Sequence, residues 1–414
     1  MNNFFHKLKS VIFPILIFVS VITIAILFAP RPLSIKVYPI KANVMIDNQA
    51  LTTSTTIWLY PKTYQLSITA EGYVPYSAEI KIGRALKYSL SIQLKPIPSP
   101  VKITENVQNI FQNQSEIFVL KNNTLFKLEN EVLKQATPAV FKNVKKIIWN
   151  PTANIAIVKI IQNKKLLQNT PFYQKDIPDE TEMTFLYDFK RYDLRNQETY
   201  FWDKDIKDAV WSVDGEYVFY VLEKPNGEKS LIKASKNNQN RKRILDLQAV
   251  GIENPFLATS PDGENLLIIP RYTPEYEKNK INLLEILTGR MTILRAEGHN
   301  IKASFSPDGK KLLFSHYQKG EGERVDLLNL LGKETELGLK NLISFPLWLG
   351  EDEIFIAQEG GKLFKLNIAQ NQKTEYIFRK EGLNISKVLI KGETAFILDN
   401  EQNLYKVKLV ENRY

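Results

Sequence analysis

A turn phrase that recurs along the chain most strongly limits what this sequence can fold into. Its best copy is residues 305–314, in which Ser-Pro-Asp-Gly separates a phenylalanine from an apolar run. Proline presets the backbone angle of the turn, aspartate can accept a hydrogen bond from the backbone ahead of it, and glycine tolerates a positive φ. The phrase therefore predicts two strands joined by a tight turn, and its recurrence predicts a repeat protein.

The copies are spaced as the blades of a β-propeller are spaced. Aligned on the residue before the turn, successive copies lie 38, 62, 48, 46, 43 and 41 residues apart. Most copies continue into a third and a fourth strand pattern, as in 281–287 and Met291–Arg295. Four short strands in a period of about 40–50 residues indicate a propeller blade. The copies are anchored at Phe111, Trp149, Trp211, Thr259, Phe305, Trp348 and Leu389.

The last copy stops at its third strand, because the chain ends at Tyr414. A ring left open there would expose an unpaired strand edge, which proteins normally avoid. Val101–Thr104 has strand character and precedes the first copy. We therefore predict that it supplies the missing fourth strand and closes a ring of seven blades. Six blades are the alternative, because the first copy matches the turn phrase least.

This repeat resembles that of TolB-type, WD-like β-propellers. Residues 259–268 and 305–314 match the phrase well, and 211–220 match it with Val213 in place of proline. The resemblance covers roughly the last three quarters of the chain. It implies a propeller fold but leaves the function open, because propellers of this kind serve binding, scaffolding and enzyme-partner roles alike.

Residues 1–30 are predicted to form a membrane anchor. Lys7 and Lys9 precede residues 11–29, which carry no charge and are long enough to span a bilayer core. A removed signal peptide is the alternative, but its apolar region is usually about 7–15 residues long and no A-x-A site follows here. A short basic N-terminus before a first span usually stays cytoplasmic, so we expect the rest of the chain outside the cytoplasm.

The region 31–94 predicts a small β-sandwich. Short runs that alternate apolar and polar residues are separated by turn signals such as Asp47-Asn48 and Glu71-Gly72. Residues 95–100 follow with three prolines, which favour an extended and semi-rigid spacer. We therefore expect an anchor, a small β domain, a proline-rich linker and a propeller over residues 101–414.

The small domain resembles a PEGA domain, a β module of prokaryotic surface proteins. The resemblance is carried by residues 42–47, 55–59 and 64–69, and most specifically by Ala-Glu-Gly-Tyr-Val-Pro-Tyr at 70–76. It implies an extracytoplasmic spacer or adhesion module, because no catalysis is associated with that family. We expect Trp58 to be a packing residue rather than part of a sugar-binding platform, and we expect the same of Tyr73.

Charge and cysteine content narrow the possible partners. The chain has a net charge of +10 and no cysteine, so disulfides and thiolate chemistry are excluded. A positive charge favours anionic surfaces such as lipid headgroups or wall polymers. Lysines are spread along the chain and no nucleic-acid motif accompanies them, so we interpret them as solvated strand faces and expect no specific nucleic acid partner.

The sequence offers no constellation for catalysis. His6, His299 and His316 lack the spacing of a metal site, and neither G-x-S-x-G nor a glycine-rich phosphate loop occurs. The recurrent turn aspartates are interpreted as backbone hydrogen-bond acceptors rather than calcium ligands. We therefore predict no enzyme activity, no metal and no cofactor. These aspartates are Asp214, Asp262 and Asp308.

Two stretches are candidates for contact with a partner. The 62-residue spacing between Trp149 and Trp211 reflects extra residues centred on 162–183, and 271–276 is a second aromatic and charged stretch. Long connections on a rigid scaffold often carry binding function. Both can instead be solvent loops with aromatic rings tucked onto a blade. The candidate residues are Phe172, Tyr173, Arg271, Tyr272 and Tyr276.

These features predict a membrane-anchored, extracytoplasmic binding or scaffold protein of the bacterial cell envelope, with the propeller as a platform for a protein or glycan partner. A structural component of a surface layer or secretion assembly is an alternative. A non-catalytic accessory of an envelope hydrolase is another. An enzyme would require a cluster of acids or histidines in the central channel of the ring.

Overall fold

The computed structural model consists almost entirely of β-strands. Its chain divides into two compact units, each described by itself below. The first unit contains residues 1–99, 376–379 and 409–414, and the second contains 100–375 and 380–408. The structure describes residues 15–23, 28–51, 56–83, 85, 87–113, 116–140, 144–152, 155–163, 180–188, 200–203, 206–252, 255–270, 279–295, 298–380 and 382–411.

Part of the predicted anchor is described as a helix. Residues 15–23 form a helix whose side chains are all exposed. Its two hydroxyls stay within the helix, since Ser20 donates to the Leu16 carbonyl at 2.8 Å and Thr23 donates to the Val19 carbonyl at 2.7 Å. Among the described residues no helix is both long and apolar enough to cross a membrane. Residues 11–14 and 24–27 of the predicted span lie outside the described residues.

The small β domain is a sandwich of two sheets, as predicted. Strand β1 lies between β4 and β7 in one sheet, and the other sheet has the order β3-β2-β5-β6. Leu33 and Ile35 of β1 share one buried core with Leu66 and Ile68 of β5. Alternation of buried and exposed residues along each strand produces this two-layer core. The strands are β1 (Arg31–Tyr38), β2 (Asn43–Ile46), β3 (Gln49–Leu51), β4 (Thr56–Leu59), β5 (Thr63–Thr69), β6 (Tyr76–Lys81) and β7 (Tyr88–Gln93).

The prediction that Trp58 packs against the core is wrong. Along β4, Ile57 and Leu59 pack against the core, so the alternation of the strand directs Trp58 outward. Its side chain is 66% exposed. Tyr73 behaves as expected, because it is partly buried against the same core.

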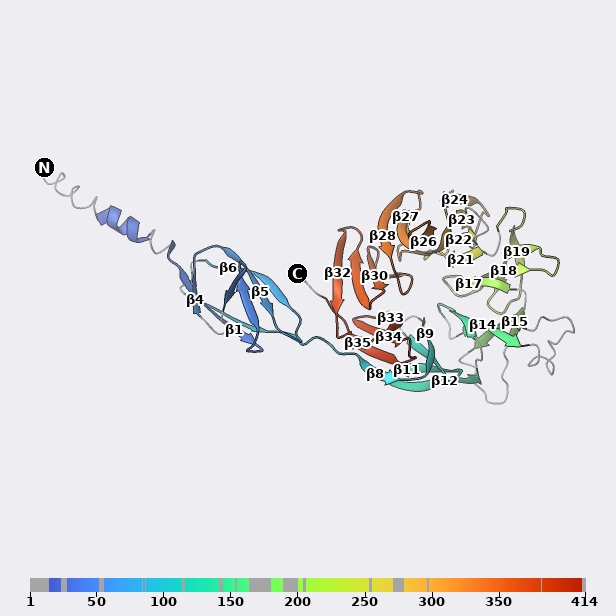
Figure 1. The fold of residues 1–414 in the computed structure, drawn as a ribbon. Coiled ribbons are helices and arrows are strands. Elements are labelled where there is room, and N and C mark those ends of the chain that lie inside the picture. Colours follow the sequence, from blue (N-terminus) through green and yellow to red (C-terminus); the bar gives the residue numbers. More distant parts are fainter. Residues whose placement is uncertain are drawn as a thin grey trace, which may run out of the picture. The chain divides into compact units, whose positions relative to one another are not determined.

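Seven antiparallel sheets, six of four strands and one of five, are described within residues 101–411, and Figure 1 shows them arranged around a ring. We call them blades 1 to 7 in chain order. Blade 1 is β9 (Val107–Asn113), β10 (Glu116–Lys121), β11 (Thr124–Glu129) and β12 (Val132–Val140). Blade 2 is β13 (Val144–Trp149), β14 (Ile155–Asn163), β15 (Glu180–Asp188) and β16 (Tyr200–Asp203). Blade 3 is β17 (Ile206–Trp211), β18 (Tyr217–Glu223), β19 (Lys229–Ser235) and β20 (Lys242–Asp246).

The remaining blades continue the same order of strands. Blade 4 is β21 (Pro255–Thr259), β22 (Asn265–Pro270), β23 (Ile281–Glu285) and β24 (Met291–Arg295). Blade 5 is β25 (Asn300–Phe305), β26 (Lys311–Gln318), β27 (Gly322–Asn329) and β28 (Glu334–Lys340). Blade 6 is β29 (Leu347–Trp348), β30 (Glu353–Gln358), β31 (Lys362–Asn367) and β32 (Gln372–Ile377), with β36 (Val410–Glu411) as a fifth strand. Blade 7 is β33 (Ile385–Lys391), β34 (Thr394–Asp399), β35 (Leu404–Lys408) and β8 (Val101–Thr104).

The hydrophobic core of the ring lies between neighbouring blades. On β18, Tyr220 is buried in the cluster between blades 2 and 3, whereas the adjacent Phe219 is buried in the cluster between blades 3 and 4. A strand buried on both faces needs a continuous apolar run rather than an alternating one. This requirement explains why the second strand of most copies reads as an unbroken hydrophobic stretch.

The N-terminal strand of the propeller closes the ring, as the sequence predicts. Strand β8 pairs antiparallel with β35, with Thr104 opposite Leu404 and Lys102 opposite Tyr405. The apolar cluster between blades 7 and 1 continues the core around the closure. The predicted role of Val101–Thr104 is therefore confirmed, and the described sheets agree with seven blades rather than six.

In three of the copies the anchor residue of the turn phrase helps to join the blades. The Trp211 indole donates to the Ile148 carbonyl of blade 2 at 3.0 Å, and the Thr259 hydroxyl donates to the Trp211 carbonyl at 3.0 Å. The Trp348 indole likewise donates to the Ser304 carbonyl of blade 5 at 3.3 Å. A polar group at this position therefore links an inner strand to that of the preceding blade.

Candidate functional site

Each blade is a meander, so its connections alternate between two edges of the ring. First-to-second and third-to-fourth connections share one edge, which we call the turn edge. It contains the turns 212–215, 260–263 and 306–309. Second-to-third connections lie at the opposite edge, which we call the variable edge. It contains the β22–β23 and β26–β27 connections.

The turn edge is held by side-chain hydrogen bonds. Asp308 Oδ1 accepts from the Ser306 hydroxyl at 2.6 Å and from the Lys310 N–H at 3.2 Å, while the Ser306 oxygen accepts from the Lys311 N–H at 3.0 Å. The bond from serine lowers the pKa of Asp308. Ser260 with Asp262, and Ser212 with Asp214, repeat the arrangement. The described residues contain no group of three or more acidic or histidine side chains arranged to hold a metal.

Connections at the variable edge differ in length from blade to blade. Residues 122–123 join β10 to β11 and 319–321 join β26 to β27, whereas 164–179 join β14 to β15 and 271–280 join β22 to β23. The predicted partner-binding residues all fall in the two long connections and lie outside the described residues. They are Phe172, Tyr173, Arg271, Tyr272 and Tyr276.

Two buried asparagines fix the point at which the second of these connections returns to the blade. The Asn279 amide donates to the Pro270 carbonyl and to the Asn300 carbonyl, both at 2.6 Å. Asn300 reciprocates, because its N–H donates to Asn279 Oδ1 at 2.6 Å and its side chain donates to the Asn279 carbonyl at 3.0 Å. These bonds tie both ends of 271–278 to the first strand of blade 5.

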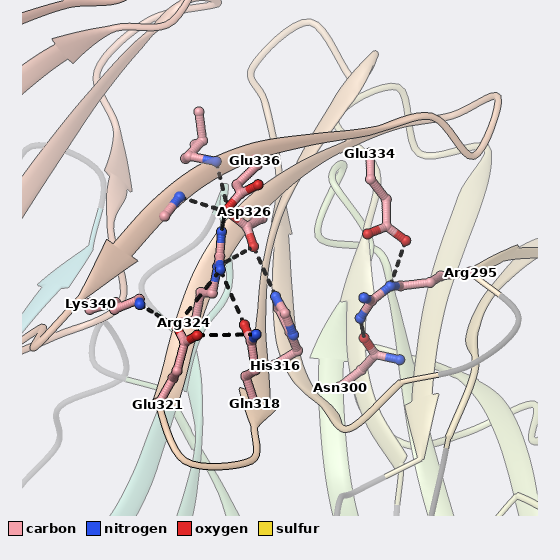
Figure 2. A network of polar contacts seen from close by, with 12 residues as sticks. Arg295, Asn300, His316, Gln318, Glu321, Arg324, Asp326, Glu334, Glu336 and Lys340 are labelled. Atoms are coloured by element: carbon pink, nitrogen blue, oxygen red, sulfur yellow. Dashed lines mark hydrogen bonds and ion pairs between the residues drawn. The ribbon is translucent and has the colours of Figure 1, made fainter.

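Arg295 extends this contact into blade 5. Its guanidinium lies 4.8 Å above the ring of Phe314, and it donates to Asn300 Oδ1 and to Glu334 Oε1, both at 2.6 Å. The side chain is 15% exposed, so the cation–π contact and the ion pair are both partly desolvated. Figure 2 shows Arg295 between Asn300 and Glu334.

Asp326 is the centre of the polar network drawn in Figure 2. Its Oδ2 accepts from His316 Nε2 and from Arg324 Nε, both at 2.9 Å. Its Oδ1 accepts from the backbone N–H of Leu337 at 2.7 Å and of Gly338 at 2.8 Å. The carboxylate therefore joins the second, third and fourth strands of blade 5.

Arg324 carries the network outward to the variable edge. Its guanidinium donates to Gln318 Oε1 at 3.1 Å and also contacts the Glu336 carboxylate. Lys340 pairs with Glu321 beside it. Acidic and basic groups thus neutralise one another around the short β26–β27 turn, as Figure 2 shows.

The charged state of the network follows from its hydrogen bonds. Burial alone raises the pKa of Asp326, but the donors His316, Gly338, Leu337 and Arg324 together hold that pKa well below its usual range. The Glu336 carboxylate is the main reason that the pKa of Arg324 is raised. Asp326 and Arg324 therefore both stay charged at neutral pH. They form a buried ion pair at the centre of the network.

The network joins three strands, and its described part contains two members of a catalytic triad without the third. An Asp–His pair resembles two members of a catalytic triad, which also needs a hydroxyl or thiol nucleophile bonded to the histidine. Within the described residues no such nucleophile bonds to His316, whose ring stacks on Phe314 with centroids 5.2 Å apart. Ser315 lies next to it on β26 but faces the other side of the sheet.

Lysines on the inner strands bind polar groups of the neighbouring blade. Lys146 of blade 2 donates to Asp208 of blade 3 at 2.7 Å, and Lys387 of blade 7 donates to Asn109 Oδ1 of blade 1 at 2.9 Å. Burial lowers the pKa of Lys387, whose ammonium also lies 5.2 Å from the Phe111 ring. In the described inner strands these contacts join neighbouring blades.

A groove of about 770 Å³ lies at the turn edge between blades 3 and 4. Lys233 on one wall lies 3.9 Å from the Tyr217 ring, and Arg243 lies beside it on the outer strand β20. Leu287 on the opposite wall is 93% exposed. The groove combines cationic, aromatic and aliphatic groups, which makes it a second surface able to contact another molecule.

The sequence did not reveal the Asp326 network. The only signal is that His316, Arg324 and Asp326 become neighbours once β26 and β27 pair, because Arg324 lies opposite His316 and Asp326 lies opposite Phe314. That register depends on the length of the turn between the strands. Arg295 comes from another blade, so no local pattern could link it to the network.

The small β domain has a known family. The model of the PEGA domain matches residues 32–98. Residues 32–98 are a PEGA domain. No curated protein matches this chain.

Several solved structures align with this chain at TM-scores below 0.5. The tricorn protease aligns at 9% identity and a TM-score of 0.47 over 85% of this chain, and the chain covers 38% of that protein. TolB from Acinetobacter baumannii aligns at 14% identity and a TM-score of 0.43 over 76% of each chain. A catalytically inactive virginiamycin B lyase from Staphylococcus aureus aligns at 13% identity and a TM-score of 0.48 over 76% of this chain and 99% of its own.

Proposed function

We propose that this chain is a membrane-anchored, extracytoplasmic binding protein of the bacterial cell envelope. In this proposal residues 1–30 hold the chain in the membrane, the PEGA domain is a spacer, and the propeller binds a protein or glycan partner. The observation that carries the proposal is the contrast between the two edges of the ring. One edge is fixed by repeated turns, and the other carries connections of unequal length on a rigid base.

The polar network gives the variable edge this rigid base. Asp326 joins three strands of blade 5, and Arg295 with Asn300 ties that blade to the ends of 271–278. Binding costs less conformational entropy when the contacting segments start from fixed ends. We propose that Arg271, Tyr272 and Tyr276, together with Phe172 and Tyr173, contact the partner from this edge.

The anchor is supported by the character of residues 15–23. Ile15, Phe18 and Ile22 are exposed, and the hydroxyls of Ser20 and Thr23 are satisfied inside the helix. Side chains of this kind suit a lipid environment, in which polar groups must find partners within the helix. A phosphatase reporter fused after Tyr414 tests the orientation. We expect activity outside the cytoplasm, and activity only with a cytoplasmic reporter would reverse the orientation.

Crosslinking of the intact protein in its native membrane tests the binding role. Captured molecules are compared between the wild type, a variant in which 164–178 is replaced by a short glycine-serine turn, and the double variant Tyr272→Ala/Tyr276→Ala. Leu331→Ser is the matched control, because Leu331 is 93% exposed at the turn edge. We expect capture of the same partner to fall at least tenfold in one or both variable-edge variants and to persist in the control. Capture that all variants retain would refute the role of the variable edge.

A further inference from the structure

Two of the exposed aromatic residues of the PEGA domain, Trp58 and Tyr60, lie where the chain enters it. Strand β4 is an edge strand that pairs with the start of β1, with Leu59 opposite Arg31 and Trp58 opposite Pro32. Tyr60 follows directly and is 64% exposed, close to the 66% of Trp58. Both rings therefore lie beside the residues through which the chain passes from the predicted anchor into the domain.

The distance from the end of the predicted span to Trp58 and Tyr60 is short. Residues paired across antiparallel strands have Cα atoms about 5 Å apart. Pro32 is three residues beyond Ala29, and an extended chain rises at most about 3.5 Å per residue. Trp58 thus lies within about 15 Å of the last apolar residue of the predicted span, and Tyr60 lies no farther. That distance is comparable with the depth of the interfacial layer of a bilayer.

The far end of the same domain provides the contrast. Strand β1 runs eight residues from Arg31 to Tyr38, which places Tyr38 and Ile40 about 20 Å or more from the point of entry. Tyr38 is 61% exposed and Ile40 is 69% exposed, so exposure alone does not distinguish the two ends of the domain. Indole and phenol rings are amphipathic and prefer the membrane–water interface. The two ends differ in distance, because Trp58 and Tyr60 lie close to the end of the predicted span and the Tyr38 ring lies far from it.

We propose that Trp58 and Tyr60 form an interfacial patch that inserts into the headgroup region of the bilayer and holds the PEGA domain against the membrane. The inference rests on the anchor of the proposed function, because it places the patch at the membrane through the anchor. The occupant is a lipid surface rather than a sugar, since the rings lie next to the point at which the chain enters the domain from the predicted span.

Tryptophan quenching by brominated lipid tests the patch. The full chain is reconstituted in nanodiscs of phosphatidylcholine and phosphatidylglycerol with and without bromine near the headgroup end of the acyl chains. We expect brominated lipid to quench the wild type, the difference to be lost in Trp58→Phe, and Trp348→Phe to be quenched like the wild type. Trp348 is the control because its indole is hydrogen-bonded inside the propeller.

Spin labels give an independent reading that does not depend on the substitution of Trp58. The chain contains no cysteine, so Tyr60→Cys and Ile40→Cys each accept one label. We expect a label at position 60 to collide more often with oxygen than with a water-soluble nickel complex, and a label at position 40 to show the reverse. Equal, water-like accessibility at both positions would overturn the patch even if the chain remains anchored.

A flotation experiment distinguishes a failure of the predicted membrane anchor from a failure of the interfacial patch. Liposomes carrying the full chain are floated after an alkaline carbonate wash, which removes peripheral proteins. Loss of the wild type from the floating fraction would refute the anchor, and the patch with it. Flotation without quenching of Trp58 would refute the patch alone. Protection of Trp58 from acrylamide by soluble oligosaccharide, without quenching by brominated lipid, would assign the rings to a sugar and also refute the patch.

Discussion

At the scale of single residues, the best-defined group in the propeller is the Asp326 carboxylate. It is buried and accepts four hydrogen bonds, two from charged or ionisable side chains and two from the backbone. Removing one member of a buried ion pair leaves the other charge buried without a counter-ion. The stability that is lost exceeds the net stability that the intact pair contributes. The stability of blade 5 therefore depends on Asp326 more than on the exposed ion pairs around it.

Asp326→Asn should lower the free energy of unfolding of the propeller by about 3 kcal/mol, because Arg324 then lacks its buried counter-ion. Urea unfolding followed by tryptophan fluorescence measures this change. Glu336→Gln is the matched control, since Glu336 contacts the same guanidinium but is 77% exposed. It should cost less than about 1 kcal/mol. Equal losses in the two variants would show that burial of Asp326 is not the source of its effect.

The pH dependence of unfolding should also change with Asp326. Its pKa in the folded chain lies below the unfolded value of about 3.9, so its contribution is fully present above that value and is lost as the pH falls through the folded pKa. Between pH 5 and pH 3 the wild type should therefore lose unfolding free energy more steeply than Asp326→Asn. Parallel curves over that range would contradict the depressed pKa.

At the scale of elements, the repeated turn decides where strands begin and end. Gly309 has a φ of 72°, a left-handed conformation in which a side chain is strained, and the same holds for Gly215 and Gly263. Asp308 and Ser306 then supply the hydrogen bonds that hold this geometry. The residue types of the turn phrase favour the backbone conformation that the turn adopts. The phrase therefore identifies the repeat reliably.

Gly309→Ala should destabilise the propeller by about 1–2 kcal/mol, because alanine is strained at this φ. Gly350→Ala is the matched control. It lies in the corresponding turn of blade 6, has no left-handed φ, and has open space at the position of a Cβ atom. Its effect should stay within about 0.5 kcal/mol. Differential scanning calorimetry distinguishes the two, and a neutral Gly309→Ala would contradict the strain argument.

Most elements could be predicted from the sequence, because strand, turn and burial give concordant local signals. Strands such as β24 match the predicted range, and β8 was predicted from the need to close the ring. The prediction for Trp58 was wrong because apolar character was equated with burial. Only the register of β4 against β1 shows that Trp58 alternates outward while Ile57 faces the core.

The candidate site was less predictable than the fold. The long connections could be found from uneven spacing of the repeats, but the network beneath the variable edge could not. Asn279 and Asn300 are twenty-one residues apart and meet only because the ends of two blades come together. Contacts between blades depend on three-dimensional register, which no single strand pattern encodes.

At the scale of the whole molecule, the ring is one closed object because its first and last strands share a blade. Strand β8 pairs with β35 so that Lys102 lies opposite Tyr405. The apolar cluster between blades 7 and 1 contains Leu389, Phe396 and Ile110. Closure removes the exposed edge that the inner three strands of blade 7 would otherwise present. The ring should therefore lose cooperativity when β8 is removed, even though no other blade is changed.

Replacement of Val101–Thr104 by Gly-Ser-Gly-Ser keeps the chain length but removes the apolar side chains and the strand preference of β8. Backbone amides of β35 should then exchange hydrogen at least tenfold faster, because the strand loses one of its two neighbours. Amides of β18 in blade 3 are the internal reference, since both neighbouring strands of β18 remain. Lys102→Ala is the control variant, because Lys102 is exposed and its alanine variant can still pair. Unchanged protection of β35 would mean that β8 covers an edge without holding the ring closed, and the mechanical role assigned to closure would have to be abandoned.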